Sequence, residues 1–280
     1  MKIAKAADIK AKKAWLRRQL QEYGKVLVAF SGGKDSFFLL QAAREILGPA
    51  NVLPFFVRTP FTLGAARERV NYLSDKFSLP VHEISIDLLQ DPHLRQNSKQ
   101  RCYHCKKKIF SALKKEARKL GIRVVVDGTT VSDLNEHRPG RVALEKLDIR
   151  SPLRDAGFTS VEIIGQLKKK GIDPYFLTSS TCLATRFPYN FSLRPQLIQA
   201  IGRVEHYLIR QGIFPLRVRH MTDGIRIETS PAHFRKIIAM KEKIIAECRT
   251  AGYRFITLDL AGIKSGCWDE FPAAKKRLSG

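Results

Sequence analysis

The sequence has no long apolar run and few acidic side chains. No window of about 18 residues is mostly apolar and free of charge, so a membrane-spanning helix is not expected. The first residues, Met1-Lys2-Ile3-Ala4-Lys5, lack the apolar segment and the cleavage site of a secretory signal peptide. We therefore expect a cytoplasmic protein that has no membrane partner.

Acidic side chains number 26 against 50 lysines and arginines, which gives a formal net charge of +24. A charge of this size concentrates polyanions near the surface, and ATP, a nucleotide-like substrate or tRNA would all fit. A solvated basic surface without such a partner would have the same composition. Hydrophobic residues make up 44% of the chain, which is enough to bury a core, so most of the chain is expected to be folded.

Cysteine is also scarce, and its count of five is odd. An odd count in a reducing compartment disfavours a disulfide framework and favours metal or redox use. Cys102 and Cys105 form a lone CxxC, and the positive charge of Arg101 and Lys106–Lys108 beside it favours the thiolate. No second CxxC and no pair of histidines at ligand spacing completes a zinc site, so zinc, redox chemistry and coincidence all remain open.

Short apolar runs alternate with segments of helical spacing over the first two thirds of the chain. Strands are predicted over residues 25–30, 52–57, 81–86 and 123–127, and helices over 3–22, 37–46, 65–77, 109–120 and 161–170. Strands that alternate with helices indicate an α/β fold, in which a parallel sheet is covered by helices on both faces.

The pattern changes after about residue 194. A helix over 197–212 precedes strands over 216–220 and 225–229, a helix over 231–249 and a strand over 253–258. This order indicates a small α+β domain. We therefore predict two domains, over residues 1–190 and 191–280.

Two adjacent glycines lie between the first short strand and the helix that follows it, in the segment Ser31-Gly32-Gly33-Lys34-Asp35-Ser36. Glycine permits a positive φ and a close approach of the backbone to a ligand, and a helix start presents N–H groups and the positive end of the helix dipole. The glycine spacing differs from that of the P-loop and of the dinucleotide fingerprint. The chemistry predicts a phosphate cradle, with an ordinary strand-to-helix turn as the alternative.

The strand pattern places three further polar side chains. Asp127 ends a predicted strand at the carboxyl edge of the sheet, where ligands of open α/β folds bind. Arg217 and Arg219 alternate along a later strand, so both point to one side, and two guanidiniums suit a phosphate. An exposed basic edge would carry the same two arginines.

The segment Ser31–Ser36 resembles the pyrophosphate loop of the N-type ATP pyrophosphatases. The resemblance implies that ATP binds here, that Asp35 holds Mg²⁺, and that the phosphates are held by Ser31, Gly32, Gly33, Lys34 and Ser36. In that superfamily a substrate oxygen attacks the α-phosphate, the substrate becomes adenylated, and pyrophosphate leaves.

A longer series of segments resembles the LarE family of ATP-dependent sulfur transferases, which build a nickel-pincer nucleotide cofactor. The resemblance covers about residues 10–272 and includes Arg101–Lys106, Asp127–Thr129, Arg138–Gly140, Arg150–Leu153, Cys182–Arg186, Arg217–His220, Arg226–Glu228 and Thr257–Leu260. It implies that a carboxylate on a pyridinium mononucleotide is adenylated, and that sulfur then displaces AMP to give a thiocarboxylate.

The resemblance also implies a shared role for three cysteines. Some family members give up the sulfur of a single cysteine, which becomes dehydroalanine, and Cys182 aligns with that position. Others hold a [4Fe-4S] cluster on three cysteines, and the presence of Cys102 and Cys105 makes this chain similar to that group. We expect Cys102, Cys105 and Cys182 to hold such a cluster, with a sacrificial Cys182 or a zinc site as the alternatives.

Further roles follow from the same resemblance. Glu205 is similar to an acidic residue near the family's active site, and together with Cys182 and Asp35 it is assigned to catalysis. Binding of nucleotide or substrate is assigned to Asp127, Gly128, Thr129, Arg186, Arg217 and Arg219, with stabilisation of a thiolate as the alternative for Arg186. The chain departs from the family pattern at Thr130, where many relatives have asparagine, and at Cys267, where the family has serine. Cys248 lies at a core position of a predicted helix and is expected to be structural.

The partners implied by the resemblance are a nucleotide-like carboxylate as substrate, a sulfide donor, and further copies of the chain in a homo-oligomer. Cluster-dependent enzymes with the same loop thiolate tRNA by the same adenylation logic, so tRNA thiolation is the nearest alternative. A nucleotide-binding regulatory protein with structural zinc is an alternative of a different class.

Overall fold

The computed structural model describes residues 8–133, 139–173 and 181–264. The chain divides into two compact units, each described here by itself. The first unit contains Met1–Leu94 and Gln100–Ser180, and the second contains Arg95–Lys99 and Thr181–Gly280. The domain boundary predicted near residue 190 stays a prediction.

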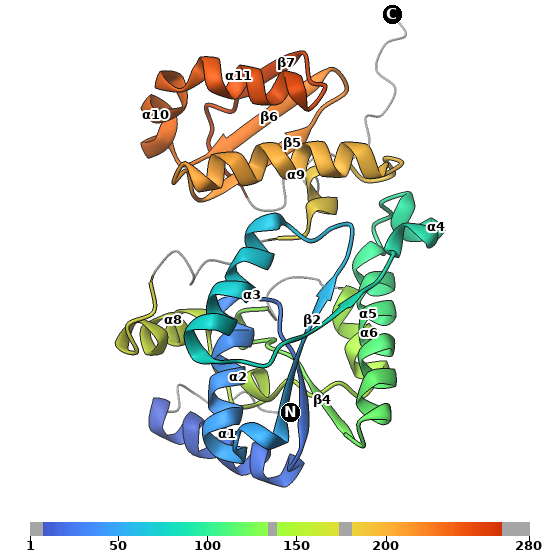
Figure 1. Ribbon diagram of the computed structural model, residues 1–280, viewed down its shortest axis with the longest axis vertical. Coiled ribbons are helices and arrows are strands. Elements are labelled where there is room, and N and C mark those ends of the chain that lie inside the picture. Colours follow the sequence, from blue (N-terminus) through green and yellow to red (C-terminus); the bar gives the residue numbers. More distant parts are fainter. Residues whose placement is uncertain (1–7, 134–138, 174–180, 265–280) are drawn as a thin grey trace, which may run out of the picture. The chain divides into compact units, whose positions relative to one another are not determined.

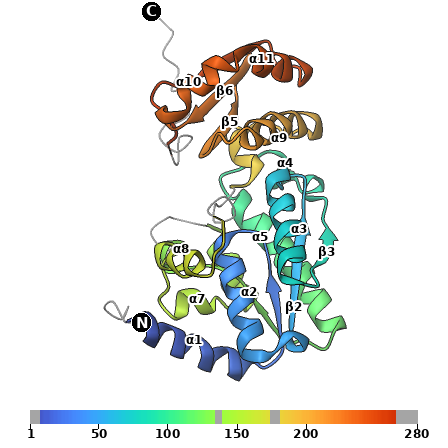
Figure 2. The same cartoon turned by 60° about the vertical axis from the view of Figure 1, so that its left-hand side comes forward.

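The first unit is built on a four-stranded parallel sheet, drawn in Figures 1 and 2. Its strands are β1 (Val26–Ala29), β2 (Val52–Arg58), β3 (His82–Ser85) and β4 (Val124–Val126), in the order β3-β2-β1-β4. β1 is apolar because it has a strand on each side and helices on both faces, whereas β4 is an edge strand that pairs with β1 and makes one isolated bridge to Arg150.

Alternate side chains of the central strand enter two separate cores. Val26 and Val28 pack against α1 (Ile9–Tyr23), α2 (Lys34–Leu47), α3 (Gly64–Phe77) and α8 (Ser160–Lys169). Leu27 packs with the side chains of α5 (Arg101–Lys119) and α6 (Pro139–Lys146) on the opposite face. The predicted α/β fold with helices on both faces of a parallel sheet is thereby confirmed.

The strand order creates a switch point beside β1. From β1 the chain adds β2 and then β3 on one side, whereas β4 lies on the other side of β1. Open α/β sheets bind ligands outside the carboxyl ends of their strands at such a point, here beside the loops that follow β1 and β4.

The second unit contains a three-stranded sheet in the order β5-β6-β7. β5 (Leu216–His220) and β6 (Gly224–Thr229) form an antiparallel hairpin, and β7 (Phe255–Leu258) pairs with β6 in parallel. Its helices are α9 (Pro195–Arg210), α10 (Phe234–Ala239) and α11 (Lys241–Thr250). This arrangement confirms the predicted α+β character.

Shorter helical segments complete the two units. They are α4 (Pro92–Arg95), α7 (Pro152–Asp155), η1 (Pro49–Asn51), η2 (Leu88–Gln90), η3 (Val131–Asp133), η5 (Leu183–Arg186) and η6 (Pro231–His233). None of the helices in the described part of the chain has the length and apolar character needed to span a lipid bilayer.

Two helices differ from the prediction. The single helix expected over 231–249 is broken at Met240, whose φ of −99° and ψ of 8° separate α10 from α11. Helix α5 begins at Arg101 and not near residue 109. Its first two turns are mostly polar, so apolar spacing revealed only the later turns, which pack on the sheet.

Candidate functional site

The loop after β1 leads directly into helix α2, in the first unit. Gly32 has a φ of +72°, and a Cβ there would lie 2.8 Å from Val70 Cγ2, so both the conformation and the space require glycine. Gly33 is the N-cap of α2 and has no side chain with which to cap the first N–H groups of the helix. These N–H groups are the expected phosphate donors.

Ser31 and Ser36 fix the shape of this loop. The Ser36 hydroxyl donates to the Gly33 carbonyl at 3.0 Å, and the Ser31 backbone N–H donates to Ser36 Oγ at 3.2 Å. The two hydroxyl oxygens lie 3.1 Å apart. These contacts hold the loop in a compact form.

Asp35 lies on the first turn of α2 and is paired with its neighbour. Lys34 Nζ is 2.9 Å from Asp35 Oδ2, and the Ser160 hydroxyl donates to Asp35 Oδ1 at 3.2 Å. Burial raises the pKa of Asp35 above its ordinary value, and the Lys34 ammonium opposes that shift. A carboxylate is the kind of hard oxygen ligand that Mg²⁺ prefers.

The loop after β4 touches the loop after β1. A Cβ on Gly128 would lie 2.7 Å from the backbone nitrogen of Ser36 and 2.8 Å from its Cα, so only glycine permits this approach. Asp127 is buried beside it and accepts hydrogen bonds from the hydroxyls of Thr129 and Ser151, each at 2.6 Å. The structure thus brings the predicted residues Ser31–Ser36 and Asp127–Thr129 together at the switch point.

Cys102 and Cys105 lie on the first turns of α5, three residues apart and so on one face of the helix. Cys102 is exposed and Cys105 is half-buried. Lys106 follows immediately, and its ammonium is 3.6 Å from Asp127 Oδ2. The helix that carries the CxxC is therefore linked to the loop after β4.

Cys182 belongs to the second unit, where it is exposed and caps the short helix η5. Arg186, at the end of η5, is fully buried. Its guanidinium donates to the hydroxyls of Thr181 at 2.6 Å and Thr185 at 2.7 Å, and to the Cys182 carbonyl at 3.4 Å. Arg186 therefore supports the turn that carries Cys182, and its predicted contact with a phosphate stays a prediction.

Glu205 is the other anchor of that turn. It lies on α9 with 1% of its surface exposed, and both of its oxygens accept hydrogen bonds from Arg186, one of them at 2.7 Å. One of these oxygens also accepts from the backbone N–H of Val218 at 3.0 Å. This carboxylate is committed to internal contacts, and its predicted catalytic role stays a prediction.

The two arginines of β5 differ in their surroundings. Arg219 is buried, donates to Glu228 at 3.0 Å and to the Thr185 carbonyl at 2.6 Å, and is neutralised inside the unit. Arg217 donates to its neighbour's carbonyl, that of Leu216, at 2.7 Å. Burial, followed by the charge of Arg186, lowers the pKa of Arg217 to about 10. Of the two, Arg217 is the cation that would gain most from a bound anion.

Several residues that support these sites could not be recognised from the sequence. Glu228, Ser151 and Lys106 were noticed only within longer segments, and Asn97 was not noticed at all. A buried residue with a single partner far along the chain leaves no periodic signal. Cys248 is fully buried on α11 as predicted, and burial, assisted by Glu247, raises its pKa to about 12.

The three cysteines assigned to a cluster are divided between the units, with two in the first and one in the second. Thiolate donors on one helical face suit two positions of an iron–sulfur cluster. Among the residues that the structure describes, no group of three or more His, Cys, Asp or Glu side chains is arranged to hold a metal ion. Arg138 and Cys267 lie outside the described residues.

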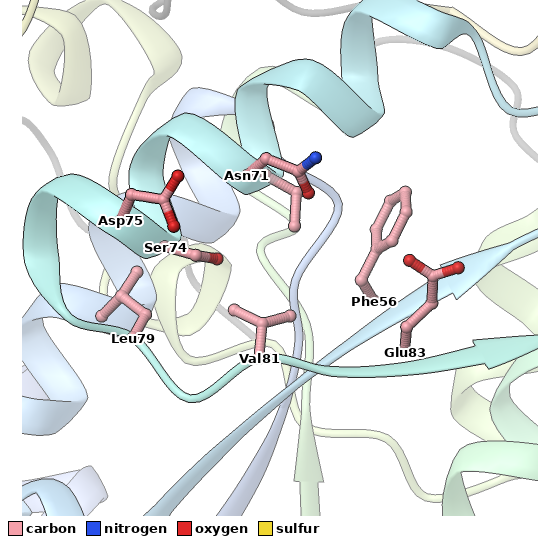
Figure 3. A pocket seen from close by; sticks show the side chains of 8 residues that line it. Phe56, Asn71, Ser74, Asp75, Leu79, Val81 and Glu83 are labelled. Atoms are coloured by element: carbon pink, nitrogen blue, oxygen red, sulfur yellow. The ribbon is translucent and has the colours of Figure 1, made fainter.

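A separate depression of about 330 Å³ lies between α3 and the strands β2 and β3, as Figure 3 shows. Its lining combines the apolar side chains of Phe56, Leu79 and Val81 with the amide of Asn71, the hydroxyl of Ser74 and the carboxylates of Asp75 and Glu83. Phe56 pairs with Glu83 and directly follows the β2 partner of Ala29, so the depression lies at the level of the carboxyl end of β1. It shares with the phosphate loop the side chain of Val70, which a Cβ on Gly32 would meet. It contains none of the predicted site residues.

Known proteins similar to this chain share most of its length. No protein-family model matches it. The pyridinium-3,5-bisthiocarboxylic acid mononucleotide synthase of Lactiplantibacillus plantarum is 30% identical over 260 residues, which are 93% of this chain and 94% of that protein. An uncharacterized protein of Synechocystis is 28% identical over 90% of this chain and 94% of its own. Another, from Methanocaldococcus jannaschii, is 32% identical over 84% and 89%. By its likeness to the synthase, the chain belongs to the LarE family.

Proposed function

We propose that this protein is an ATP-dependent sulfur transferase that converts a carboxylate of a pyridinium mononucleotide into a thiocarboxylate. The observation that carries the proposal is the contact of Gly128 with the first turn of α2, in a chain 30% identical to a synthase named for such a product. The contact joins a phosphate-binding loop to a polar loop at the switch point, which is the arrangement a nucleotide site needs.

The reaction has two steps. A carboxylate oxygen of the substrate attacks the α-phosphorus of ATP, the bond from this phosphorus to the bridging oxygen breaks, and pyrophosphate leaves. A sulfur nucleophile then attacks the acyl carbon, the bond from that carbon to the AMP oxygen breaks, and AMP leaves with the electron pair. The product is the thiocarboxylate.

The residues of the first unit would bind and orient ATP. The N–H groups at the start of α2 and the hydroxyls of Ser31 and Ser36 would bind the pyrophosphate end. Asp35 would hold Mg²⁺, and Lys34, which now pairs with Asp35, would turn to a phosphate oxygen. Asp127, fixed by Thr129 and Ser151, would orient the nucleotide or the substrate.

The second unit would supply the anion-binding cation and one thiol. Arg217 would bind the phosphate of the mononucleotide, because its guanidinium is half-buried beside the positive charge of Arg186. We propose that Cys182 joins Cys102 and Cys105 in holding a [4Fe-4S] cluster, which, when bound by three thiolates, has one iron able to carry an extra sulfide. The second possibility is that Cys182 itself donates its sulfur.

One measurement separates these two sources of sulfur. Iron and acid-labile sulfide would be measured per chain after anaerobic purification, in the parent and in Cys182→Ala. About four irons and four sulfides in the parent, lost in the variant, would support the cluster. Absence of iron, with loss of one H₂S from the mass of the parent after turnover, would mean that Cys182 is consumed.

Adenylation itself is tested by pyrophosphate release. Asp35→Asn should lower substrate-dependent release at least about 100-fold, equivalent to about 2.7 kcal/mol, because Mg²⁺ loses a charged ligand. The control is Asp223→Asn, the same change at an exposed turn of the second unit. Equal rates for Asp35→Asn and the parent would exclude the assigned role of Asp35.

A further inference from the structure

Five residues of the second unit, 95–99, interrupt the sequence of the first unit, and we call them the strap. Residues 95–99 belong to the second unit, although residues 94 and 100 on either side belong to the first. The strap makes backbone hydrogen bonds to the segment that follows η5, from Leu193 N–H to the Arg95 carbonyl at 2.7 Å and from Asn190 N–H to the Asn97 carbonyl at 3.2 Å. The second unit therefore contains a piece of chain that leads directly into helix α5.

Asn97 is the centre of this strap. It is fully buried, and its φ of +50° is a left-handed conformation that asparagine tolerates better than most residues. Its side-chain amide nitrogen donates to the carbonyls of Ala184 at 3.2 Å, Phe187 at 3.1 Å and Pro188 at 2.7 Å. All three neighbours are acceptors, so the nitrogen and not the oxygen of the amide must face them.

These three carbonyls belong to the turn that carries Cys182. The Thr185 N–H donates to the Cys182 carbonyl at 3.0 Å, so Cys182 is part of the same turn. Arg186 and Glu205 hold this turn through contacts between side chains, whereas the amide of Asn97 binds its backbone carbonyl groups. The Oδ1 atom of Asn97 is buried and has no hydrogen-bond partner. A buried acceptor without a hydrogen bond destabilises the folded state. The three hydrogen bonds of the amide nitrogen must offset that cost.

Asn97 is also close in sequence to the CxxC. Cys102 follows it by five residues, and five residues of extended chain span no more than about 18 Å. The same short stretch therefore holds the turn of Cys182 at one end and leads to the helix of Cys102 and Cys105 at the other.

We propose that Asn97 is a positioning residue, which fixes the turn of Cys182 to the strap that leads into the helix of Cys102 and Cys105. The inference rests on the proposed function, in which these three thiols act together. Without the three contacts of its amide, the turn would keep its anchors on α9, and only the two backbone hydrogen bonds beyond the turn would still connect it to the strap.

The test compares two asparagines that have the same backbone conformation. Asn97→Gly keeps the left-handed backbone and removes the amide. Asn190→Gly is the matched control, because Asn190 has a φ of +62° in the same unit and an exposed side chain. Metal-free protein would be treated with dibromobimane, which bridges two nearby thiols, and the bridged peptides would be quantified by mass spectrometry. The bridge between Cys102 and Cys105 lies within one helix and serves as the internal standard.

We expect bridges from Cys182 to Cys102 or Cys105 in the parent and in Asn190→Gly, and at least a fivefold lower yield in Asn97→Gly. Amide hydrogen exchange over residues 182–188 should become at least tenfold faster in Asn97→Gly alone. Faster exchange with an unchanged bridge yield would mean a purely structural role and would overturn the proposal. If Asn97→Gly does not fold, Asn97→Ser keeps one donor and should give an intermediate yield.

The proposed function can fail separately. If the parent forms no bridge to Cys182, the three thiols do not act together and the cluster assignment is wrong. In that case the hydrogen exchange of Asn97→Gly still decides the local role of Asn97, because exchange requires no second cysteine. Unchanged exchange would overturn the anchoring role whatever the bridges show.

Discussion

Gly128 shows how much of the nucleotide site depends on a single missing Cβ. Its backbone lies against the first turn of α2, where the N–H groups expected to bind phosphate are located. Any larger residue must push either the loop after β4 or the start of α2 out of place. The contact therefore sets the separation of the two loops.

Gly128→Ala should weaken ATP binding at least about tenfold and lower the stability by about 1–3 kcal/mol, because the added methyl group meets backbone atoms that are not free to move. Calorimetric titration and thermal unfolding would measure the two effects. Gly165→Ala is the control, since Gly165 is exposed on α8 with nothing within 4 Å of an added Cβ. It should raise stability by about 0.5–1 kcal/mol and leave ATP affinity unchanged. Unaltered ATP affinity in Gly128→Ala would contradict the assigned site.

His220 is a second residue whose setting predicts a measurement. It is buried among Phe187 and Phe191, and its Nδ1 lies 3.2 Å from the hydroxyl of Tyr253. Burial lowers the pKa of His220 below the ordinary value of 6.5. The unfolded chain therefore takes up a proton more readily than the folded one.

The stability due to neutral His220 is complete above the unfolded pKa of about 6.5 and is lost as the pH falls toward the lowered folded pKa. The free energy of unfolding should fall by up to about 1.4 kcal/mol per pH unit over that window. In His220→Phe this component of the slope should be absent. Urea denaturation from pH 8 to 5 measures both proteins, and identical slopes would show that His220 does not cause the dependence.

At the scale of elements, apolar periodicity predicted the strands of the first sheet within about two residues at each end. It placed Asp127 at the carboxyl edge and Ser31–Ser36 at a helix start, because both follow from short buried strands. It missed the beginning of α5, where the residues are mostly polar. It also missed the break at Met240, because the apolar pattern continues through it. The assignment of Arg219 to a phosphate came from the family resemblance and stays a prediction. Its partner Glu228 could not be found from the sequence, because the two residues become neighbours only when β5 and β6 pair.

One ion pair joins two elements that are far apart in the sequence. Lys12 of α1 donates to both oxygens of Glu162 of α8, at 2.7 and 2.9 Å, and Glu162 also completes a capping box with Thr159. Burial would raise the pKa of Glu162, but the bonds from Lys12 and Thr159 prevail and lower it.

Glu162→Gln should therefore lower the free energy of unfolding by about 1–3 kcal/mol at neutral pH, because Lys12 stays buried without its carboxylate. The lowered pKa means that the contribution is present above the unfolded value near 4.5 and is lost as the pH falls through the folded value. Denaturant titrations at pH 7 and pH 3.5 would test this. A deficit of equal size at both pH values would contradict an electrostatic origin.

At the scale of the whole molecule, the net charge of +24 fits both a small anionic substrate and tRNA, and a binding experiment separates the two. Helix α5 exposes Lys107, Lys115 and Arg118, whereas α1 exposes Lys10, Lys13 and Arg17. Replacing either set with glutamine removes three positive charges. If the enzyme acts on a small substrate, its binding to tRNA should be non-specific and should weaken steeply as the salt concentration rises. The affinity for tRNA should then decrease equally in the two triple variants. Gel shifts over a salt series measure this. A preference for tRNA over unrelated RNA that only the α5 variant loses would instead favour tRNA thiolation.

The buried thiol of Cys248 can be used to detect local opening of the second unit. With a pKa of about 12 and no exposed surface, this sulfur cannot be labelled while α11 remains packed. Pulses of a thiol reagent, read by mass spectrometry, would therefore time the rare excursions in which the helix separates from its sheet. Cys248 is thus a built-in reporter of local opening, and its use requires no engineered cysteine.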